Sequence, residues 1–267
     1  MGDTVKGGRK SAVGAGLAPF SSPVAAASLG IALVLALLIF HGFPAIDRAV
    51  SGLFFVDAAC PAGQTHGAIC GIFPAGHSAI LSTVRQFLQH LPAAIATGLG
   101  AAYVTRLAMG TPARDPSMTP LATALLAYLL SVGLLVNGLL KPFSGRPRPL
   151  YSEPFGGALP FVPAGEFTNY CPSNCSFVSG EAAAAAWLIG AVALLPQRYS
   201  SLRLPAFLAA VVYAVATSTL RISFGAHYLS DTVVAALATL TIFAVLAGFE
   251  VRHRKTPRPG ETFGLSA

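Results

Sequence analysis

The sequence predicts an all-α fold, a polytopic membrane bundle of six transmembrane helices with a polar site on its outer face. Of the 267 residues, 54% are hydrophobic and only 10% are charged, a composition typical of membrane proteins. Apolar stretches of about 20 residues, enough to cross a hydrocarbon layer of about 30 Å, recur along the chain. Because lipid offers no hydrogen-bond partners to the backbone, each stretch is predicted to be a helix.

The six predicted spans follow one another through most of the chain, and each is rich in small and aliphatic residues. They are Pro23–Phe43, Leu91–Ala108, Thr119–Leu140, Ser179–Leu195, Leu204–Leu220 and Tyr228–Phe249. The second span is the least regular, because Arg106 lies near its end. Just before it, apolar residues from Ile80 to Leu91 recur on one helical face, which predicts an amphipathic helix lying on the membrane surface.

The spans divide the chain into one membrane domain, residues 23–249, and two basic tails, residues 1–22 and 250–267. The N-terminal tail has the composition of the charged region of a signal peptide. No small-residue cleavage motif follows Phe40, however, so we expect the first span to be retained. The C-terminal tail contains Pro and Gly and is predicted to be disordered.

Basic residues are distributed unevenly between the two sides of the predicted bundle. Six spans place both tails on one side, and the loops of that side hold most of the 17 Lys and Arg residues. The positive-inside rule therefore predicts cytoplasmic termini and a periplasmic opposite face, in a bacterial inner membrane. The net charge of +7 fits contact with anionic head groups. Nothing in the sequence resembles a nucleic-acid-binding module.

All four cysteines fall in loops that this topology places in the periplasm, where disulfides persist. The local pairing, Cys60 with Cys70 and Cys171 with Cys175, is the one we expect, although four cysteines allow three connectivities. Buried free thiols are the alternative. The spacings and the lack of nearby histidines disfavour a metal site.

Three charged clusters interrupt the apolar sequence at the ends of predicted spans. The first runs from Lys141 to Pro149, the second from Ser176 to Glu181, and the third from Arg221 to Asp231. Ionisable groups are costly at a membrane unless they act together. The alternation of spans brings all three clusters to the outer face, so we expect them to form one active site there.

The basic residues of these clusters predict a phosphate-binding site. Guanidinium and ammonium groups suit the oxygens of a phosphate dianion, and we assign this role to Lys141, Arg148 and Arg221. Gly180, at the start of a predicted helix, would let the phosphate approach the backbone. Two interpretations stay open for Arg146, a phosphate contact or a surface charge.

His227 and Asp231 lie four residues apart, on one face of the helix that begins there. An aspartate that accepts a hydrogen bond from one ring nitrogen orients the other for nucleophilic attack. We expect a phosphohistidine intermediate, with no metal or other cofactor, because the three cations neutralise the phosphate. Glu181 is the candidate general acid, and its alternative role is that of a structural partner for a nearby arginine.

These motifs together resemble the type-2 phosphatidic acid phosphatase superfamily of metal-independent membrane phosphatases with six helices. The resemblance rests on Lys141-x6-Arg148-Pro149, Ser179-Gly180 and Arg221-x5-His227-x3-Asp231, in that order. It implies phosphate binding by the three cations, assisted by the backbone amides of Ser179 and Gly180. It also implies attack by His227, oriented by Asp231.

Two positions depart from the family pattern. Glu181 stands where a histidine is usual, and Leu220 precedes Arg221 where a serine is usual. The carboxylate at Glu181 resembles the bacterial lipid A phosphatases, in particular the 4′-phosphatase type. A Pro-Ala-Gly-His segment ending at His77 is similar to the missing motif but lies out of order, so we interpret it as a turn, with a surrogate acid as the alternative.

The sequence therefore predicts a phosphomonoesterase whose partners are the bilayer and a membrane lipid phosphate, with lipid A as the favoured substrate. Phosphatidic acid, phosphatidylglycerol phosphate and undecaprenyl pyrophosphate are the alternative substrates. A lipid phosphotransferase is the alternative reaction. The alternative outside the enzymes is a lipid-phosphate binder or transporter with the same scaffold, but binding alone does not need an oriented nucleophile.

Overall fold

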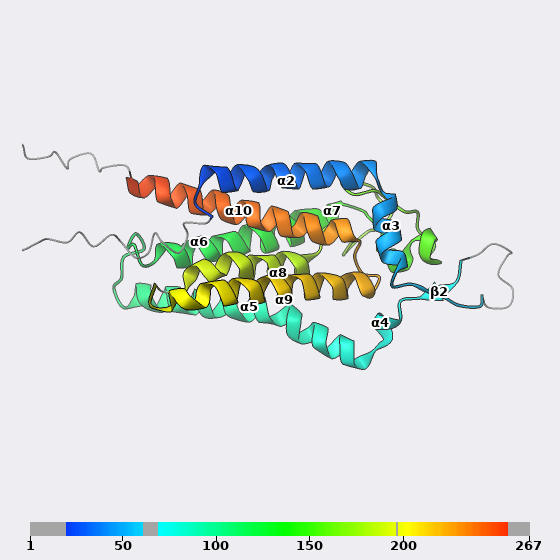
Figure 1. Cartoon of the computed structure of the whole chain (residues 1–267), viewed down its shortest axis with the longest axis horizontal. Helices are drawn as coiled ribbons and strands as arrows, with labels where there is room; N and C mark the ends of the chain where they lie inside the picture. The colour runs from blue at the N-terminus through cyan, green and yellow to red at the C-terminus, as the bar shows by residue number, and fades with distance from the viewer. Residues whose placement is uncertain (1–19, 61–68, 196, 256–267) are drawn as a thin grey trace, which may run out of the picture.

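A computed structural model describes residues 20–60, 69–195 and 197–255, and it shows a bundle of helices with one short β-hairpin (Figure 1). The helical elements, with one π-helical (η1) and several 3₁₀ segments, are α2 (Pro23–Gly42), α3 (Ala45–Gly52), α4 (Pro74–His77), α5 (Ala79–Ala108), α6 (Thr119–Tyr128), η1 (Leu129–Leu140), α7 (Lys141–Phe143), η2 (Pro149–Tyr151), η3 (Glu153–Phe155), α8 (Gly180–Ala191), η4 (Val192–Leu194), η5 (Gln197–Leu202), α9 (Arg203–Ser223) and α10 (Leu229–Lys255). Strands β1 (Val56–Asp57) and β2 (Gly71–Ile72) pair antiparallel, with Val56 opposite Ile72.

Four helices of the described chain are long and apolar enough to cross a membrane, by length and composition. They are Pro23–Gly42, Thr119–Phe143, Tyr199–Ser223 and Leu229–Phe249. They match the first, third, fifth and sixth predicted spans within a few residues. The other two predicted spans correspond to the second part of α5 and to α8 with η4, which are helical but are not among the four. The predicted tails lie largely outside the described residues, and α10 extends to Lys255.

The predicted surface helix and the second predicted span form one continuous helix, α5, instead of two separate elements. Pro92 lies inside this helix. A proline removes one backbone hydrogen bond and kinks a helix without ending it when neighbouring groups support both halves. Figure 1 shows α5 changing direction on its way toward α4.

The short helix α8 forms the centre of the bundle, packed against α9 and α10. Its run from Ala182 to Ala186 is fully buried or nearly so, because small side chains let neighbouring helices approach closely. Trp187 fills the end of this face and donates its indole hydrogen bond to the carbonyl of Ala124 at 2.8 Å. A Cβ atom at Gly190 would lie 2.6 Å from the Phe243 ring, so this position has room only for glycine.

One end of the bundle carries α3, α4, the hairpin and the loops around α7, whereas α2 begins and α10 ends at the opposite end (Figure 1). The helix ends that bear the three charged clusters therefore meet beneath those loops. Asn137 and Lys141 approach this end within the continuous stretch α6–η1–α7, whose middle portion is π-helical. Such wider turns re-aim side chains and occur mostly at functional sites.

Candidate active site

The three charged clusters meet at one cavity of about 410 Å³. Six of the eight residues predicted to act on the phosphate line it: Lys141, Arg148, Gly180, Glu181, Arg221 and His227. They come from α7, the loop before η2, the first turn of α8, the last turn of α9 and the turn before α10. Ser179 and Asp231 are buried beside the cavity without lining it.

His227 is 2% exposed, and its ring is fixed by a backbone carbonyl. Its Nδ1 lies 2.8 Å from the carbonyl oxygen of Ser176. A carbonyl can only accept, so Nδ1 carries the proton and Nε2 keeps a free electron pair. Burial lowers the pKa of His227 to about 4, an effect that Asp231 opposes and Arg221 reinforces. The imidazole is therefore neutral near pH 7, as a nucleophile must be.

Asp231 does not bond to the imidazole directly, which corrects part of the predicted arrangement. Its Oδ2 lies 3.7 Å from Nδ1 of His227, beyond hydrogen-bond distance. Oδ2 instead accepts from the Ser176 hydroxyl at 2.5 Å and from the backbone N–H of Tyr228 at 2.8 Å. Asp231 thus holds both the residue whose carbonyl orients His227 and the turn that carries His227.

Arg146 is neither a phosphate contact nor a surface charge, so both interpretations were wrong. It is fully buried and bridges Asp231 at 2.6 Å and Asp47, in α3, at 2.7 Å. Burial opposes its charge, but the two carboxylates outweigh burial and raise the pKa of Arg146 above its ordinary value. The Ser230 hydroxyl and the carbonyl of Val162 accept further bonds from Arg146, so its charge is well satisfied.

The cations and the start of α8 face the same cavity. A Cβ atom on Gly180 would lie 3.3 Å from Nζ of Lys141, so glycine lets the ammonium approach the helix start. The hydroxyl of Ser179 caps α8 by accepting from the N–H of Ala182 at 3.3 Å. The backbone N–H of Ser179, expected to assist phosphate binding, instead donates to the carbonyl of Asp231 at 3.1 Å, so Ser179 stabilises the start of α8 without offering its amide to the cavity. Arg148 is held by two hydrogen bonds, at 3.0 and 3.2 Å, to the carbonyl of Asn174.

Glu181 is paired with arginines, as the structural interpretation of this residue expected. Its Oε1 accepts from Nη2 of Arg85 at 2.6 Å and from Nε at 3.1 Å. Nε of Arg221 lies 3.4 Å from the same oxygen. The second oxygen, Oε2, has a longer contact of 3.4 Å with Nε of Arg85. Glu181 lines the cavity, and Oε2 is the less engaged of its two oxygens.

The comparisons with known proteins agree with this geometry. Residues 121–255 match the model of the PAP2 superfamily. The chain belongs to this superfamily. It is 41% identical to "Lipid A 4′-phosphatase" of Rhizobium leguminosarum over 79% of this chain and 89% of that protein. The protein of the same name from Rhizobium etli is 39% identical over 79% of this chain and 81% of that protein.

A solved structure shows the same fold. The crystal structure of a transmembrane PAP2-type phosphatidylglycerolphosphate phosphatase from Bacillus subtilis matches 87% of this chain and 98% of that chain, with a TM-score of 0.56 and 19% identity. The superfamily match and the relatives identify this PAP2 chain as a phosphatase, a phosphoric monoester hydrolase. The relatives, the shared fold and the apolar helices together support a multi-pass membrane protein.

Arg85 is the main residue of the PAP2 site that sequence reasoning missed. Arg85 belongs to the segment for which the sequence predicts a surface helix, and in the structure α5 brings it to the cavity, along with His90. A single arginine in an apolar helical face was the available signal, because such a charge is costly without a partner. Asn137 and Asn174 also line the cavity, and neither was singled out.

A second cavity of about 410 Å³ adjoins the first and shares Arg85, Arg148 and Arg221 with it. His77 lines this second cavity and not the one that contains His227. The out-of-order Pro-Ala-Gly-His segment forms α4, the turn before α5, as expected. Since His77 does not line the cavity that His227 lines, this placement gives no support to His77 as a surrogate acid.

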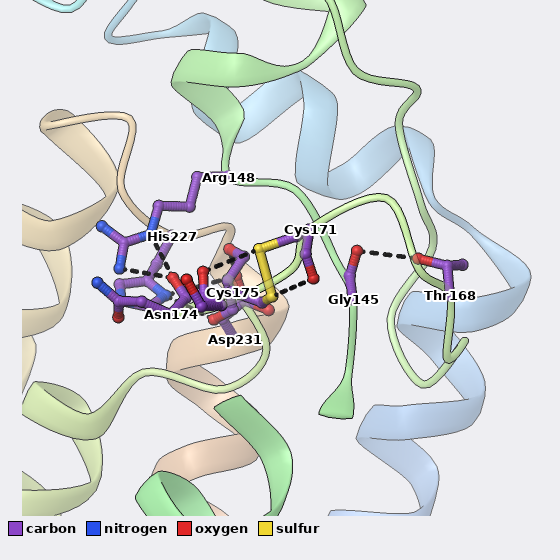
Figure 2. The surroundings of a disulfide bond; sticks show 10 residues. Gly145, Arg148, Thr168, Cys171, Asn174, Cys175, His227 and Asp231 are labelled. Atoms are coloured by element: carbon purple, nitrogen blue, oxygen red, sulfur yellow. Dashed lines mark hydrogen bonds and ion pairs between the residues drawn. A yellow bond between two sulfur atoms is a disulfide. The ribbon is translucent and has the colours of Figure 1, made fainter. Parts of the chain in front are cut away.

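Both expected disulfides of the PAP2 chain are present, between Cys60 and Cys70 and between Cys171 and Cys175. The first closes the hairpin, and the second lies beside the active-site cavity (Figure 2). Within the described parts of the chain, no three His, Cys, Asp or Glu side chains gather in a way that could hold a metal ion.

Proposed function

We propose that this PAP2 enzyme removes the 4′-phosphate of lipid A at the periplasmic face of a six-span bundle whose termini are cytoplasmic. The observation that carries the substrate is the identity of about 40% with two lipid A 4′-phosphatases across most of their length. Glu181, the carboxylate where most of the superfamily has histidine, supports the same branch.

The proposed reaction begins with attack by Nε2 of His227 on phosphorus. The N–P bond forms as the bond from phosphorus to the sugar oxygen breaks. Lys141, Arg148 and Arg221 take up the charge on the three non-bridging oxygens, and the start of α8 adds its N–H groups. These groups surround the cavity before any substrate binds, so little reorganisation is needed at the transition state.

Glu181 takes up a proton on Oε2 when the phosphate dianion binds, and in this protonated form it is the proposed donor to the departing sugar oxygen. Arg85 holds Oε1 and leaves Oε2, the less engaged oxygen, toward the leaving group. In the second step Glu181 takes a proton from water, the water oxygen bonds to phosphorus, and the N–P bond breaks. Inorganic phosphate leaves, and His227 and Glu181 return to their starting forms. Arg85 is therefore a positioning residue in this proposal.

The test is phosphate release by the detergent-purified protein, with EDTA present. Lipid A, phosphatidic acid, phosphatidylglycerol phosphate and undecaprenyl pyrophosphate serve as substrates. Mass spectrometry of the product identifies which lipid A phosphate is lost. We expect release of the 4′-phosphate, abolished by His227→Ala. Release from another lipid only, or turnover that survives His227→Ala, would overturn the substrate or the nucleophile, respectively.

A further inference from the structure

We infer that the loop closed by the Cys171–Cys175 disulfide is a positioning element of the active site, which holds Arg148 and His227 in their working orientations. This inference rests on the proposed roles of those two residues in phosphate binding and attack. Figure 2 shows the disulfide loop beside Arg148, His227 and Asp231.

The first contact of the loop fixes the guanidinium of Arg148. Nε and Nη2 of Arg148 donate to the carbonyl oxygen of Asn174, at 3.2 and 3.0 Å. Two donors on one acceptor set the plane of the planar guanidinium as well as its position. The carbonyl of Asn174, which lies within the loop closed by the disulfide, therefore fixes the orientation of the Arg148 guanidinium.

The backbone conformation of Asn174 depends on this closed loop. Its φ of 48° lies in the left-handed region, which non-glycine residues seldom adopt and in which asparagine is enriched. A covalent link between Cys171 and Cys175 restricts the conformations that the residues between them can reach. The carbonyl of Asn174 consequently stays pointed at Arg148 instead of toward solvent.

The second contact fixes the nucleophile. The residue directly after Cys175 is Ser176, whose carbonyl accepts from Nδ1 of His227 at 2.8 Å and whose hydroxyl donates to Asp231 at 2.5 Å. Because Ser176 is joined directly to Cys175, a displacement of Cys175 would disturb both of these interactions. The loop therefore positions both the imidazole of His227 and the guanidinium of Arg148.

The loop is also attached to the segment that carries the phosphate-binding residues. The N–H of Cys171 donates to the carbonyl of Gly145 at 3.0 Å, and the N–H of Cys175 faces the carbonyl of Lys141 at 3.4 Å. Gly145 itself has a φ of +63°, and a Cβ atom there would lie 1.7 Å from the carbonyl oxygen of Thr168. The backbone at Thr168 can therefore approach Gly145 this closely only because residue 145 has no side chain.

The second disulfide provides a matched control. Cys60 and Cys70 are separated by 10 residues in the sequence, against 4 for Cys171 and Cys175. In the chain-entropy view a longer closed loop stabilises the folded state more. Opening the hairpin disulfide should therefore cost more stability, and opening the Cys171–Cys175 disulfide should cost more function.

The experiment compares Cys171→Ser/Cys175→Ser with Cys60→Ser/Cys70→Ser in the full-length protein. The readouts are kcat and KM on the lipid that the wild type hydrolyses, inhibition by orthovanadate as a phosphate analogue, and the midpoint of thermal unfolding. For the first variant we expect vanadate inhibition about tenfold weaker, the size of one lost charge-assisted hydrogen bond, and a lower kcat. The control variant should keep wild-type kcat and vanadate inhibition.

Arg148→Lys tests whether the effect passes through Arg148, since lysine cannot make the two-pronged contact. In that background, opening the Cys171–Cys175 disulfide should weaken vanadate binding much less. A second route avoids any folding defect. The folded Cys60→Ser/Cys70→Ser protein is treated with a phosphine reductant and then reoxidised, so that the lost activity should return.

Unchanged kcat and vanadate inhibition after opening the Cys171–Cys175 disulfide would overturn the inference. An equal loss of vanadate binding in the Arg148→Lys background would overturn the part of the inference that concerns Arg148. Failure of the proposed function has a different signature, because a wild-type protein that hydrolyses none of the lipids can still be tested for vanadate binding and its dependence on the disulfide.

Discussion

Replacing Arg146 with methionine would test the buried network behind the active site. Arg146 forms ion pairs of 2.6 Å with Asp231 and 2.7 Å with Asp47, and all three side chains are fully buried. Methionine fills a similar volume but leaves two carboxylates buried without their cation. Breaking a buried pair in this way costs about 3–5 kcal/mol. The total stability of a folded domain is only about 5–15 kcal/mol.

The expected result is a large fall in the unfolding midpoint of the detergent-solubilised protein, about 6–20 °C for a chain of this size. Adding Asp47→Asn to Arg146→Met should recover part of the loss, because it removes one of the two unpaired charges. Arg148→Met is the matched control, since Arg148 borders the cavity and should affect activity far more than stability. An Arg146→Met protein within about 1 kcal/mol of wild type would refute the reasoning, because that loss is ordinary for any substitution.

The remaining predictions concern the cavity itself. Glu181→Gln should lower kcat by about 10²–10⁴-fold with little change in KM, and wild-type kcat in this variant would exclude Glu181 as the acid. The pKa of His227, lowered by burial to about 4 from 6.5, means that the unfolded chain binds a proton between these pH values and the folded protein does not. Stability should therefore fall as pH drops from 6.5 to 4, with a slope that His227→Gln reduces; a slope equal to the wild type would contradict the buried neutral ring. Gly180→Ala should raise KM, because its Cβ would lie 3.3 Å from Nζ of Lys141, and an unchanged KM would show that the ammonium adjusts freely.

The helices and the meeting of the charged clusters were predictable because they depend on local quantities. An apolar run of the right length identifies a span, and the alternation of spans identifies which ends share a face. Lys141, Arg221 and His227 lie at such ends, so their convergence at one cavity followed from the order of the motifs. The disulfide pairing followed similarly from short sequence separations.

The rest depends on contacts between segments far apart in the chain. Asp47 lies 99 residues before Arg146, and no local pattern connects them. Arg85 and Glu181 are 96 residues apart, and Arg85 reaches Glu181 from helix α5, whose path through Pro92 no local pattern reveals. The acceptor that orients His227 is a backbone carbonyl, which every residue has and which a sequence therefore cannot mark.

The buried ion pairs also show how far the functional unit extends. The part of the chain that matches the superfamily begins at residue 121, yet two partners of its charged clusters come from earlier segments: Asp47 beside Arg146, and Arg85 beside Glu181. A chimera that joined residues 121–255 to the preceding segment of another relative would leave Arg146 with Asp231 alone and Glu181 with Arg221 alone, each without its second partner. The half of the chain that carries the motifs and the segment that precedes it therefore depend on each other through buried charges, so the structural unit of this site is larger than the part that matches the family.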